Sequence, residues 1–277
     1  MHKIPFLLLA LVCLVSCVGE KVDCYELEGV PLRFSEYVYL DSCDSPAGSE
    51  AGRMNVNFRI GYVYGDADSE VAMAINREIV AYEFGQEYKD STLAAAVAAC
   101  VTTSKEEFFS IWEDDFLEDM QANYEHNKSS SFVKGQGGVL CYESYDYIYE
   151  AGAHGVYGNW VLNFDYTTGR LLSYADVFEP SKEAHVRQLI QQCLIADLKS
   201  EGLLDVESVQ DLKANGYMFE ENLLPSTRVF RLGEDGITFI YGIYSIAPYA
   251  LGETVVTVPY DMIEGFIQKD VLDLLAL

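Results

Sequence analysis

Residues 53–63 read RMNVNFRIGYV, and this stretch decides the class of the fold. Apolar side chains occupy every second position: Met54, Val56, Phe58, Ile60 and Tyr62. A period of two indicates a β-strand with one face packed on a core and the other face in solvent. Residues 31–40 predict a partner strand, so the folded part of the chain is expected to open with a sheet.

Helical patterns follow this expected sheet. From residue 69 to residue 84 the apolar side chains recur every three or four positions, which predicts an amphipathic helix. Residues 92–102 are rich in alanine and favour a second helix. Ser104 and Glu107 match a capping box, so we expect a third helix from there to about Tyr124.

The character of the sequence changes at residue 128. Residues 128–138 are rich in Ser and Gly and predict a loop or hairpin tip. Beyond them we expect strands at 139–149, 156–166 and 254–258, helices at 182–200 and 206–214, a hairpin from 227–232 to 237–244, and a C-terminal helix. Because strands and helices come in clusters, we expect an α+β fold, with antiparallel sheets packed against helices in two subdomains, 31–127 and 128–277.

The first 16 residues predict a signal peptide, with a basic residue, an apolar run and small residues before a cleavage point. The sequence from Leu14 to Cys17 resembles a bacterial lipobox, in which the cysteine is acylated and becomes the new N-terminus. The alternative is an ordinary signal peptide in which Cys17 is incidental. We therefore expect a lipid anchor at Cys17, a tether over residues 17–30, and a protein held on a bacterial membrane in the cell envelope, periplasmic or surface-exposed.

Charge and composition bound the partners of the folded part. The formal net charge is −26, half of the residues are hydrophobic and 13% are aromatic. This composition supports a packed core and argues against wholesale disorder. An acidic surface repels nucleic acid and anionic lipid and attracts cationic proteins, so no nucleic-acid partner is expected. A solvated face that confers solubility is the simpler reading of most of these acids.

The cysteines do not indicate a metal or redox site. Five remain after Cys17, and none is spaced as CxxC, so we expect no metal and no cofactor. Cys24 and Cys43 are suited to close a loop by a disulfide in an exported protein. Cys100 and Cys193 fall on apolar faces of expected helices, where a buried free thiol is the common outcome.

Three stretches in the second half carry a family resemblance. They are residues 152–178, with Gly152–Gly155, NFDYTTG at 163–169 and YADVF at 174–178; residues 244–252, YSIAPYALG; and residues 256–260, VTVPY. Their order and separation resemble the extracellular part of the lysozyme-sensing anti-sigma factor RsiV. The resemblance covers about residues 150–265, a domain of unknown function that many exported proteins share.

The resemblance implies a capacity to bind a protein ligand, with lysozyme as the precedent. The anti-sigma relatives carry a cytoplasmic segment and a spanning helix before this domain, whereas a lipoprotein signal stands in that place here. The signalling role is therefore not carried over to this chain.

Five residues are our candidates for ligand binding: His154, Tyr157, Trp160, Tyr244 and Tyr249. Aromatic side chains offer a large rigid surface with a polar tip, which suits recognition. Core packing is the alternative for each aromatic residue, and for His154 the alternative is a turn stabilised by hydrogen bonds to the backbone. We predict no catalytic residue, because His154 has no evident Ser, Cys or metal partner in the sequence.

Two acidic stretches are weaker candidates. Residues 66–70 alternate carboxylates that suit Ca²⁺, but Val71 stands where an EF-hand loop needs Gly. Residues 113–119 crowd carboxylates that suit the acid pair of a glycosidase, although their spacing does not specify that geometry. An acidic helix N-terminus and a solvated face are the readings we prefer.

The sequence thus favours an envelope lipoprotein that acts as a non-enzymatic binding module for a protein or cell-wall ligand, with a lysozyme-like protein as the leading partner. Two alternatives stay open: an enzyme or accessory that modifies peptidoglycan or polysaccharide, and a structural envelope lipoprotein.

Overall fold

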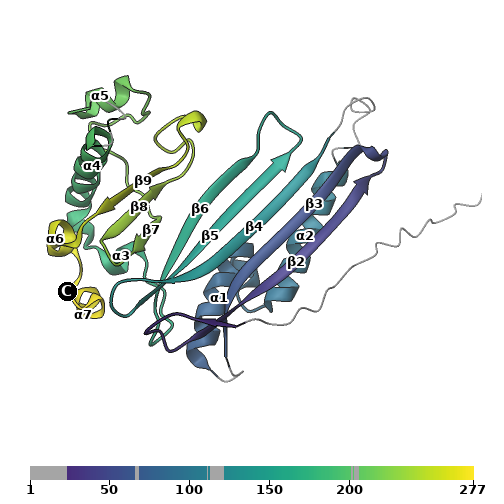
Figure 1. Ribbon diagram of the computed structural model, residues 1–277, viewed down its shortest axis with the longest axis horizontal. Coiled ribbons are helices and arrows are strands. Elements are labelled where there is room, and N and C mark those ends of the chain that lie inside the picture. The colour runs from purple at the N-terminus through teal and green to yellow at the C-terminus, as the bar shows by residue number, and fades with distance from the viewer. Residues whose placement is uncertain (1–23, 66–68, 111, 113–121, 201, 203–205) are drawn as a thin grey trace, which may run out of the picture.

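The computed structural model describes residues 24–65, 69–110, 112, 122–200, 202 and 206–277. The expectations for Cys17 and for residues 66–68 and 113–119 lie outside the described residues. Within the described part, no helix combines the length and the apolar character needed to span a bilayer. The fold is α+β, as predicted, and it contains a six-stranded and a three-stranded sheet (Figure 1).

The larger sheet contains six strands in sequence order. They are β1 (Tyr25–Glu26), β2 (Arg33–Ser45), β3 (Gly48–Tyr64), β4 (Tyr124–Lys134), β5 (Val139–Glu150) and β6 (Val156–Asp165). All neighbours are antiparallel except β3 and β4, which are parallel, so the expectation of antiparallel sheets is wrong for this pair. The parallel pair follows from the helices between these strands, since a parallel connection has to cross over the sheet.

Two long helices cover one face of this sheet (Figure 1). They are α1 (Glu70–Phe84) and α2 (Leu93–Ser110), joined through a short 3-10 helix, η1 (Gln86–Tyr88). Ile75 and Ile79 of α1 pack with Phe58 of β3 in one fully buried core. The alternation that predicted a half-buried strand is confirmed, because the intervening Asn55 and Asn57 are exposed.

The helix boundary expected at Ser104 is wrong. Helix α2 runs without a break through residue 104 to Ser110, and Tyr124, where the third helix was expected to end, is the first residue of β4. Ser104 is 2% exposed, and its hydroxyl contacts Nδ1 of His126 at 3.1 Å instead of capping a helix. A local capping pattern was overridden by a long-range polar contact.

The remaining elements form a second layer beside β6 (Figure 1). They are α3 (Tyr174–Val177), η4 (Pro180–Lys182), α4 (Glu183–Ser200), α5 (Val209–Ala214), β7 (Phe230–Leu232), β8 (Ile237–Tyr241), η5 (Tyr249–Leu251), β9 (Thr254–Val258), α6 (Tyr260–Ile263), η6 (Glu264–Phe266) and α7 (Lys269–Leu275). Strands β7, β8 and β9 form the antiparallel smaller sheet, and α4 packs against β9. One apolar core joins this layer to Val139 and Cys141 of β5.

Asn163 connects the two sheets. Its side chain is 1% exposed, donates from Nδ2 to the carbonyl of Phe230 at 2.8 Å, and accepts from the amide of Leu232 at 2.9 Å. It thereby bonds two backbone groups of β7 that would otherwise be buried without a partner. The two sheets are held close at this point.

The loop expected at residues 128–138 is mostly strand. Residues 128–134 belong to β4, and the turn is confined to residues 135–138. The boundary expected between residues 127 and 128 falls inside β4, so both expected parts contribute strands to the larger sheet. The expected tether also includes β1, at Tyr25–Glu26.

The disulfide expected between Cys24 and Cys43 is absent, since all five described cysteines are free thiols. Tyr25 pairs with Phe34, and Cys43 lies far along the same strand from Phe34, roughly 30 Å away at about 3.3 Å per residue. A disulfide requires Cα atoms within about 7 Å, so the strand register forbids this bond.

Candidate binding site

Four aromatic side chains gather at the N-terminal end of β6, and we call them the aromatic cluster: His154, Tyr157, Tyr244 and Tyr249. Tyr249 is the hub of the cluster. It stacks on His154 with ring centroids 4.1 Å apart, and its ring lies 6.0 Å from Tyr157 and 5.7 Å from Tyr244. The cluster thus joins the β5–β6 hairpin tip to the loop between β8 and β9, which are far apart in the sequence.

Hydrogen bonds fix the cluster to the hairpin. The hydroxyl of Tyr249 donates to the carbonyl of Gly155 at 3.1 Å, and Nδ1 of His154 lies 3.0 Å from the same carbonyl. His154 therefore does stabilise its turn, as the alternative reading held, while its ring remains exposed. Tyr244 is 56% exposed, so the cluster keeps a surface open to a partner.

Trp160 does not join the aromatic cluster. Neighbouring residues of a strand face opposite sides of the sheet, and Trp160 shares the side of Leu162 and Phe164, whose core lies under α1 and α2. Its ring contacts Tyr82 of α1 at a centroid distance of 6.4 Å. Its side chain is 41% exposed and lines the groove between the two sheets, together with Tyr145 and Asn159.

The backbone is strained in both loops of the cluster. Ala151 and Tyr244 adopt φ values of 53° and 63°, a region that glycine enters freely but that other residues, apart from Asn and Asp, rarely enter. Such strain persists where the surrounding structure holds it, and it gathers at functional sites.

The Tyr244→Gly variant should be more stable than the Tyr244→Ala variant by about 1 kcal/mol. Both substitutions remove the ring, but only alanine keeps the strain of a left-handed backbone conformation. At position 249, in the 3-10 helix η5, the Tyr249→Ala variant should instead be more stable than the Tyr249→Gly variant, by about 0.5–1 kcal/mol. Urea unfolding of the four variants gives both differences. Equal stability of the two position-244 variants would rule out strain at this residue.

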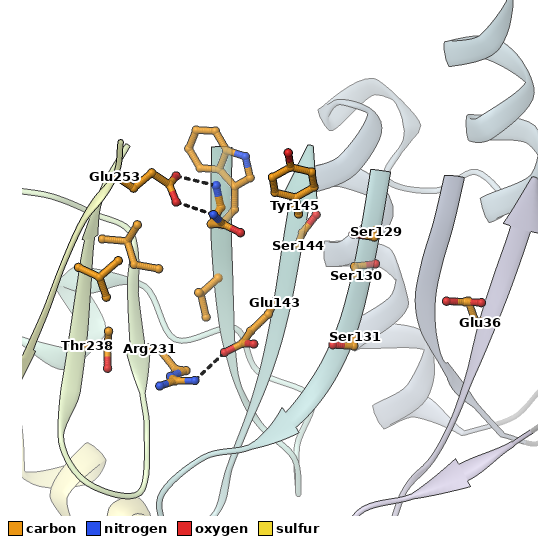
Figure 2. Close-up of a pocket in the computed structure, with 15 residues that line it drawn as sticks. Glu36, Ser129, Ser130, Ser131, Glu143, Ser144, Tyr145, Arg231, Thr238 and Glu253 are labelled. Atoms are coloured by element: carbon orange, nitrogen blue, oxygen red, sulfur yellow. Dashed lines mark hydrogen bonds and ion pairs between the residues drawn. The ribbon is translucent and has the colours of Figure 1, made fainter. Parts of the chain in front are cut away.

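A groove of about 550 Å³ lies between the two sheets, next to the cluster. From the larger sheet it is lined by Glu36, Ser129, Ser130, Ser131, Glu143, Ser144, Tyr145, Asn159, Trp160 and Val161, and from the smaller layer by Arg231, Thr238, Ile240, Glu253 and Val255 (Figure 2). The volume is within the range of ligand sites in proteins. Tyr145 connects the groove to the cluster, since its ring lies 6.1 Å from that of Tyr157.

Two contacts span the groove (Figure 2). Arg231 forms an ion pair with Glu143 at 2.8 Å, and the backbone amide of Asn159 donates to Oε1 of Glu253 at 2.9 Å. Burial raises the pKa of Tyr145, and the neighbouring tyrosines and Glu253 raise it further. The tyrosine therefore stays neutral at physiological pH and offers a hydroxyl for hydrogen bonding.

A second polar group of residues lies between the larger sheet and its covering helices. Lys128 forms ion pairs with Asp146 at 2.7 Å and with Glu83 at 3.3 Å, and Nε2 of His126 lies 3.2 Å from Asp146. Burial alone would lower the pKa of Lys128, but the two carboxylates outweigh it and raise this pKa. Burial likewise opposes ionisation of Asp146, while His126 and Lys128 hold its pKa below the usual value.

Ser104, His126 and Asp146 contact one another in series and have the residue types of a hydrolase triad, but the serine and the histidine are enclosed in the core. Ser104 is 2% exposed and His126 is 5% exposed, and the ring of Phe58 packs edge-on against His126 at 4.8 Å. A nucleophile enclosed in this way cannot reach a substrate. Among the described residues, no group of three or more His, Cys, Asp or Glu side chains is placed to hold a metal ion.

Sequence reasoning missed Tyr145, Glu253 and the buried ionic group. Tyr145 and Tyr147 alternate with Ser144 and Asp146, a pattern from which their common face could have been inferred. Glu253 carried no signal, because its role depends on the approach of two loops.

The comparisons with known proteins agree with the fold. Residues 175–261 match the family model described as "Protein of unknown function (DUF3298)". The search of curated proteins found no match. A crystal structure of a DUF3298 family member from Bacteroides fragilis NCTC 9343 has a TM-score of 0.75 at 24% identity, covering 88% of this chain and 97% of that one. A DUF3298 family protein from Pseudomonas aeruginosa PAO1 has a TM-score of 0.59 at 18% identity, covering 87% and 96%.

Proposed function

We propose that this protein is an envelope lipoprotein that binds a protein ligand through the aromatic cluster, without performing catalysis. The observation that carries the proposal is the convergence of His154, Tyr157, Tyr244 and Tyr249 beside an open groove. Aromatic residues held rigidly at a surface are the side chains that contribute most to protein recognition. The strained backbone at Tyr244 supports the same assignment.

The anchor in this proposal is the acyl group on Cys17. Its support is the sequence from Leu14 to Cys17, preceded by the apolar run of a signal peptide. A multiply acylated cysteine holds a protein on a membrane without a spanning helix, because each buried methylene contributes about 0.8 kcal/mol. The folded part would then face the envelope or the cell exterior.

A cationic protein is the partner that the charge favours. With a formal net charge of −26, the chain attracts basic proteins over long distances. The resemblance to the lysozyme-sensing domain makes lysozyme the first protein to test. Electrostatic attraction of this kind acts mainly on the association rate and weakens as salt screens it.

The test is retention of lysozyme by the immobilised full-length, acylated protein at about 10 mM and about 150 mM salt, where the screening length falls from about 30 Å to about 8 Å. We expect retention at both concentrations, with faster association at low salt. Loss of retention at both would eliminate lysozyme as the ligand, and association rates that ignore salt would contradict the role of charge.

The enzymatic alternative has weaker support. The Ser104–His126–Asp146 series is enclosed, and the contacts of His154 are with Gly155, Tyr244 and Tyr249, none of which is an acid or a thiol. His154 is oriented by the Gly155 carbonyl and the ring of Tyr249, but no described nucleophile or acid contacts it, as a catalytic base would require.

A further inference from the structure

The outer edge of β6 lies in the groove with unpaired backbone groups. In an antiparallel pair, alternate residues point both backbone groups at the partner strand, and the others point both groups away. The carbonyl of Asn163 accepts from Leu172, and the amide of Asn159 donates to Glu253, so these two residues point away from β5. Since the β5–β6 register is unbroken, Tyr157 and Val161 point the same way.

This edge is sealed at one end and open along the rest. The Asn163 end is closed by Leu172 and by the side-chain bonds to β7. From Tyr157 to Val161 the edge spans about 13 Å. Within the described part of the chain, the outward backbone groups of Val161 have no hydrogen-bond partner. Proteins usually cover such an edge, because it is a template for another strand.

There is space on both faces of the edge at Val161. The groove of about 550 Å³ is lined by residues from both faces of the larger sheet, with Ser144 and Trp160 on one face and Tyr145 and Asn159 on the other. A second cavity of about 480 Å³ is lined by Val161 together with Leu162, Tyr174 and Phe230. Side chains of an added strand alternate between the two faces of a sheet, so a strand on this edge needs room on both. The first cavity is bordered by Ile240 and Val255, and the second is largely apolar.

Glu253 occupies the edge in the free protein. Its carboxylate accepts hydrogen bonds from both the backbone amide and the side-chain amide of Asn159 (Figure 2). At the backbone amide it takes the position that the carbonyl of an added strand would occupy. Glu143 is paired with Arg231, and Glu36 with Arg59, whereas Glu253 has no ion pair with a described residue. A carboxylate displaced from Asn159 would therefore seek a cation.

We propose that the groove binds an extended, basic peptide segment that adds as a seventh strand to the outer edge of β6. The peptide backbone pairs with Asn159 and Val161, one basic side chain takes Glu253, and an apolar side chain packs between Val161 and Ile240. This proposal rests on the function proposed above and specifies how part of the protein ligand is read. Main-chain bonds supply affinity in strand addition, and alternate side chains supply specificity.

A seven-residue probe tests the proposal: Ac-Thr-Lys-Leu-Val-Leu-Lys-Thr-NH2, which places Lys and Val on one face and Leu on the other in either direction. Titration into the isotope-labelled full-length protein should shift the amides of Asn159 and Val161. The matched peptide with Glu in place of both Lys should bind at least about tenfold more weakly, because Glu253 would repel it.

Two methylated isomers of the probe test strand pairing itself. One carries N-methyl groups on its Lys and Val residues, and the other on its Thr and Leu residues. An added strand turns one of these two amide sets toward β6, so one isomer should lose at least about tenfold in affinity while the other stays within about threefold. Equal binding or equal loss by the isomers, or no shift with the parent peptide, would overturn the proposal.

A variant gives an independent test. Val161→Pro removes the outward amide without touching the ladder to β5, a placement that edge strands tolerate. It should weaken the parent peptide at least about tenfold, and Val161→Thr, which keeps the amide, should not. If Val161→Pro binds the peptide normally but lysozyme retention still depends on Tyr249, strand addition fails and the proposed function stands. If lysozyme is not retained but the peptides and the Val161 variants behave as expected, strand addition stands and lysozyme is not the ligand.

Discussion

Replacing Lys128 with methionine should destabilise the protein by about 3–5 kcal/mol, the usual result of removing one partner from a buried ion pair. The side chain of Lys128 is 7% exposed and lies between Glu83, which is 2% exposed, and Asp146. Without the ammonium group, two carboxylates remain close together with no cation between them. Urea unfolding of the variant measures the loss directly.

Lys89→Met is the matched control for this substitution. Lys89 forms an ion pair with Glu78 at the same 2.7 Å distance, but both side chains are partly in solvent, so its loss should cost less than about 1 kcal/mol. Adding Glu83→Gln to Lys128→Met should recover part of the stability, because one unpaired carboxylate is removed. A Lys128→Met loss no larger than that of Lys89→Met would show that the pairs contribute little.

Replacing Asn163 with leucine should cost about 2–6 kcal/mol, since it leaves the carbonyl of Phe230 and the amide of Leu232 buried without partners, at about 1–3 kcal/mol each. Leucine has the branching and the number of side-chain heavy atoms of asparagine, but its methyl groups are bulkier than the amide, so overpacking adds to the loss. Thermal or urea unfolding provides the measurement.

Asn57→Leu controls for the change of side chain. Asn57 is exposed on β3, where a substitution should alter stability by no more than about 0.5 kcal/mol. If the Asn163 and Asn57 variants are equally stable, the two sheets are not held together by this side chain, and the geometry of the groove would need another explanation.

The sequence predicted the elements whose patterns are local. The alternation in residues 53–63 was sufficient for β3, because one face of that strand packs on helices and the other meets solvent. The helix from Ser69 was equally readable, since the hydroxyl of Ser69 accepts from the amide of Ala72 as an N-cap should.

The failures share a long-range cause. Lys128 and the serines after it look like a loop, and only the ion pairs of Lys128 with Glu83 and Asp146 make a buried lysine acceptable at this position of a strand. The capping pattern at Ser104 misled for the same reason, because His126 takes its hydroxyl. No local pattern contains these partners.

The candidate binding residues show the same difference between local patterns and long-range contacts. His154, Tyr157, Tyr244 and Tyr249 converge because two loops end at the same side of the sheets. Trp160 was grouped with them by proximity in sequence, although the period of a strand already places it and Tyr157 on opposite faces. Glu253 and the open edge of β6 required the relative placement of the two sheets.

The central claim is that recognition takes place at the aromatic cluster, and the most direct measurement compares the dissociation constants of lysozyme for Tyr249→Ala and Tyr64→Ala. Both changes remove a partly exposed tyrosine ring, but Tyr249 is the hub of the cluster, whereas Tyr64 lies on β3 and lines neither the groove nor the second cavity. We expect Tyr249→Ala to weaken binding about thirtyfold, equivalent to about 2 kcal/mol, and Tyr64→Ala to leave it within about twofold. Equal effects of the two substitutions, or a larger effect of Tyr64→Ala, would contradict the account.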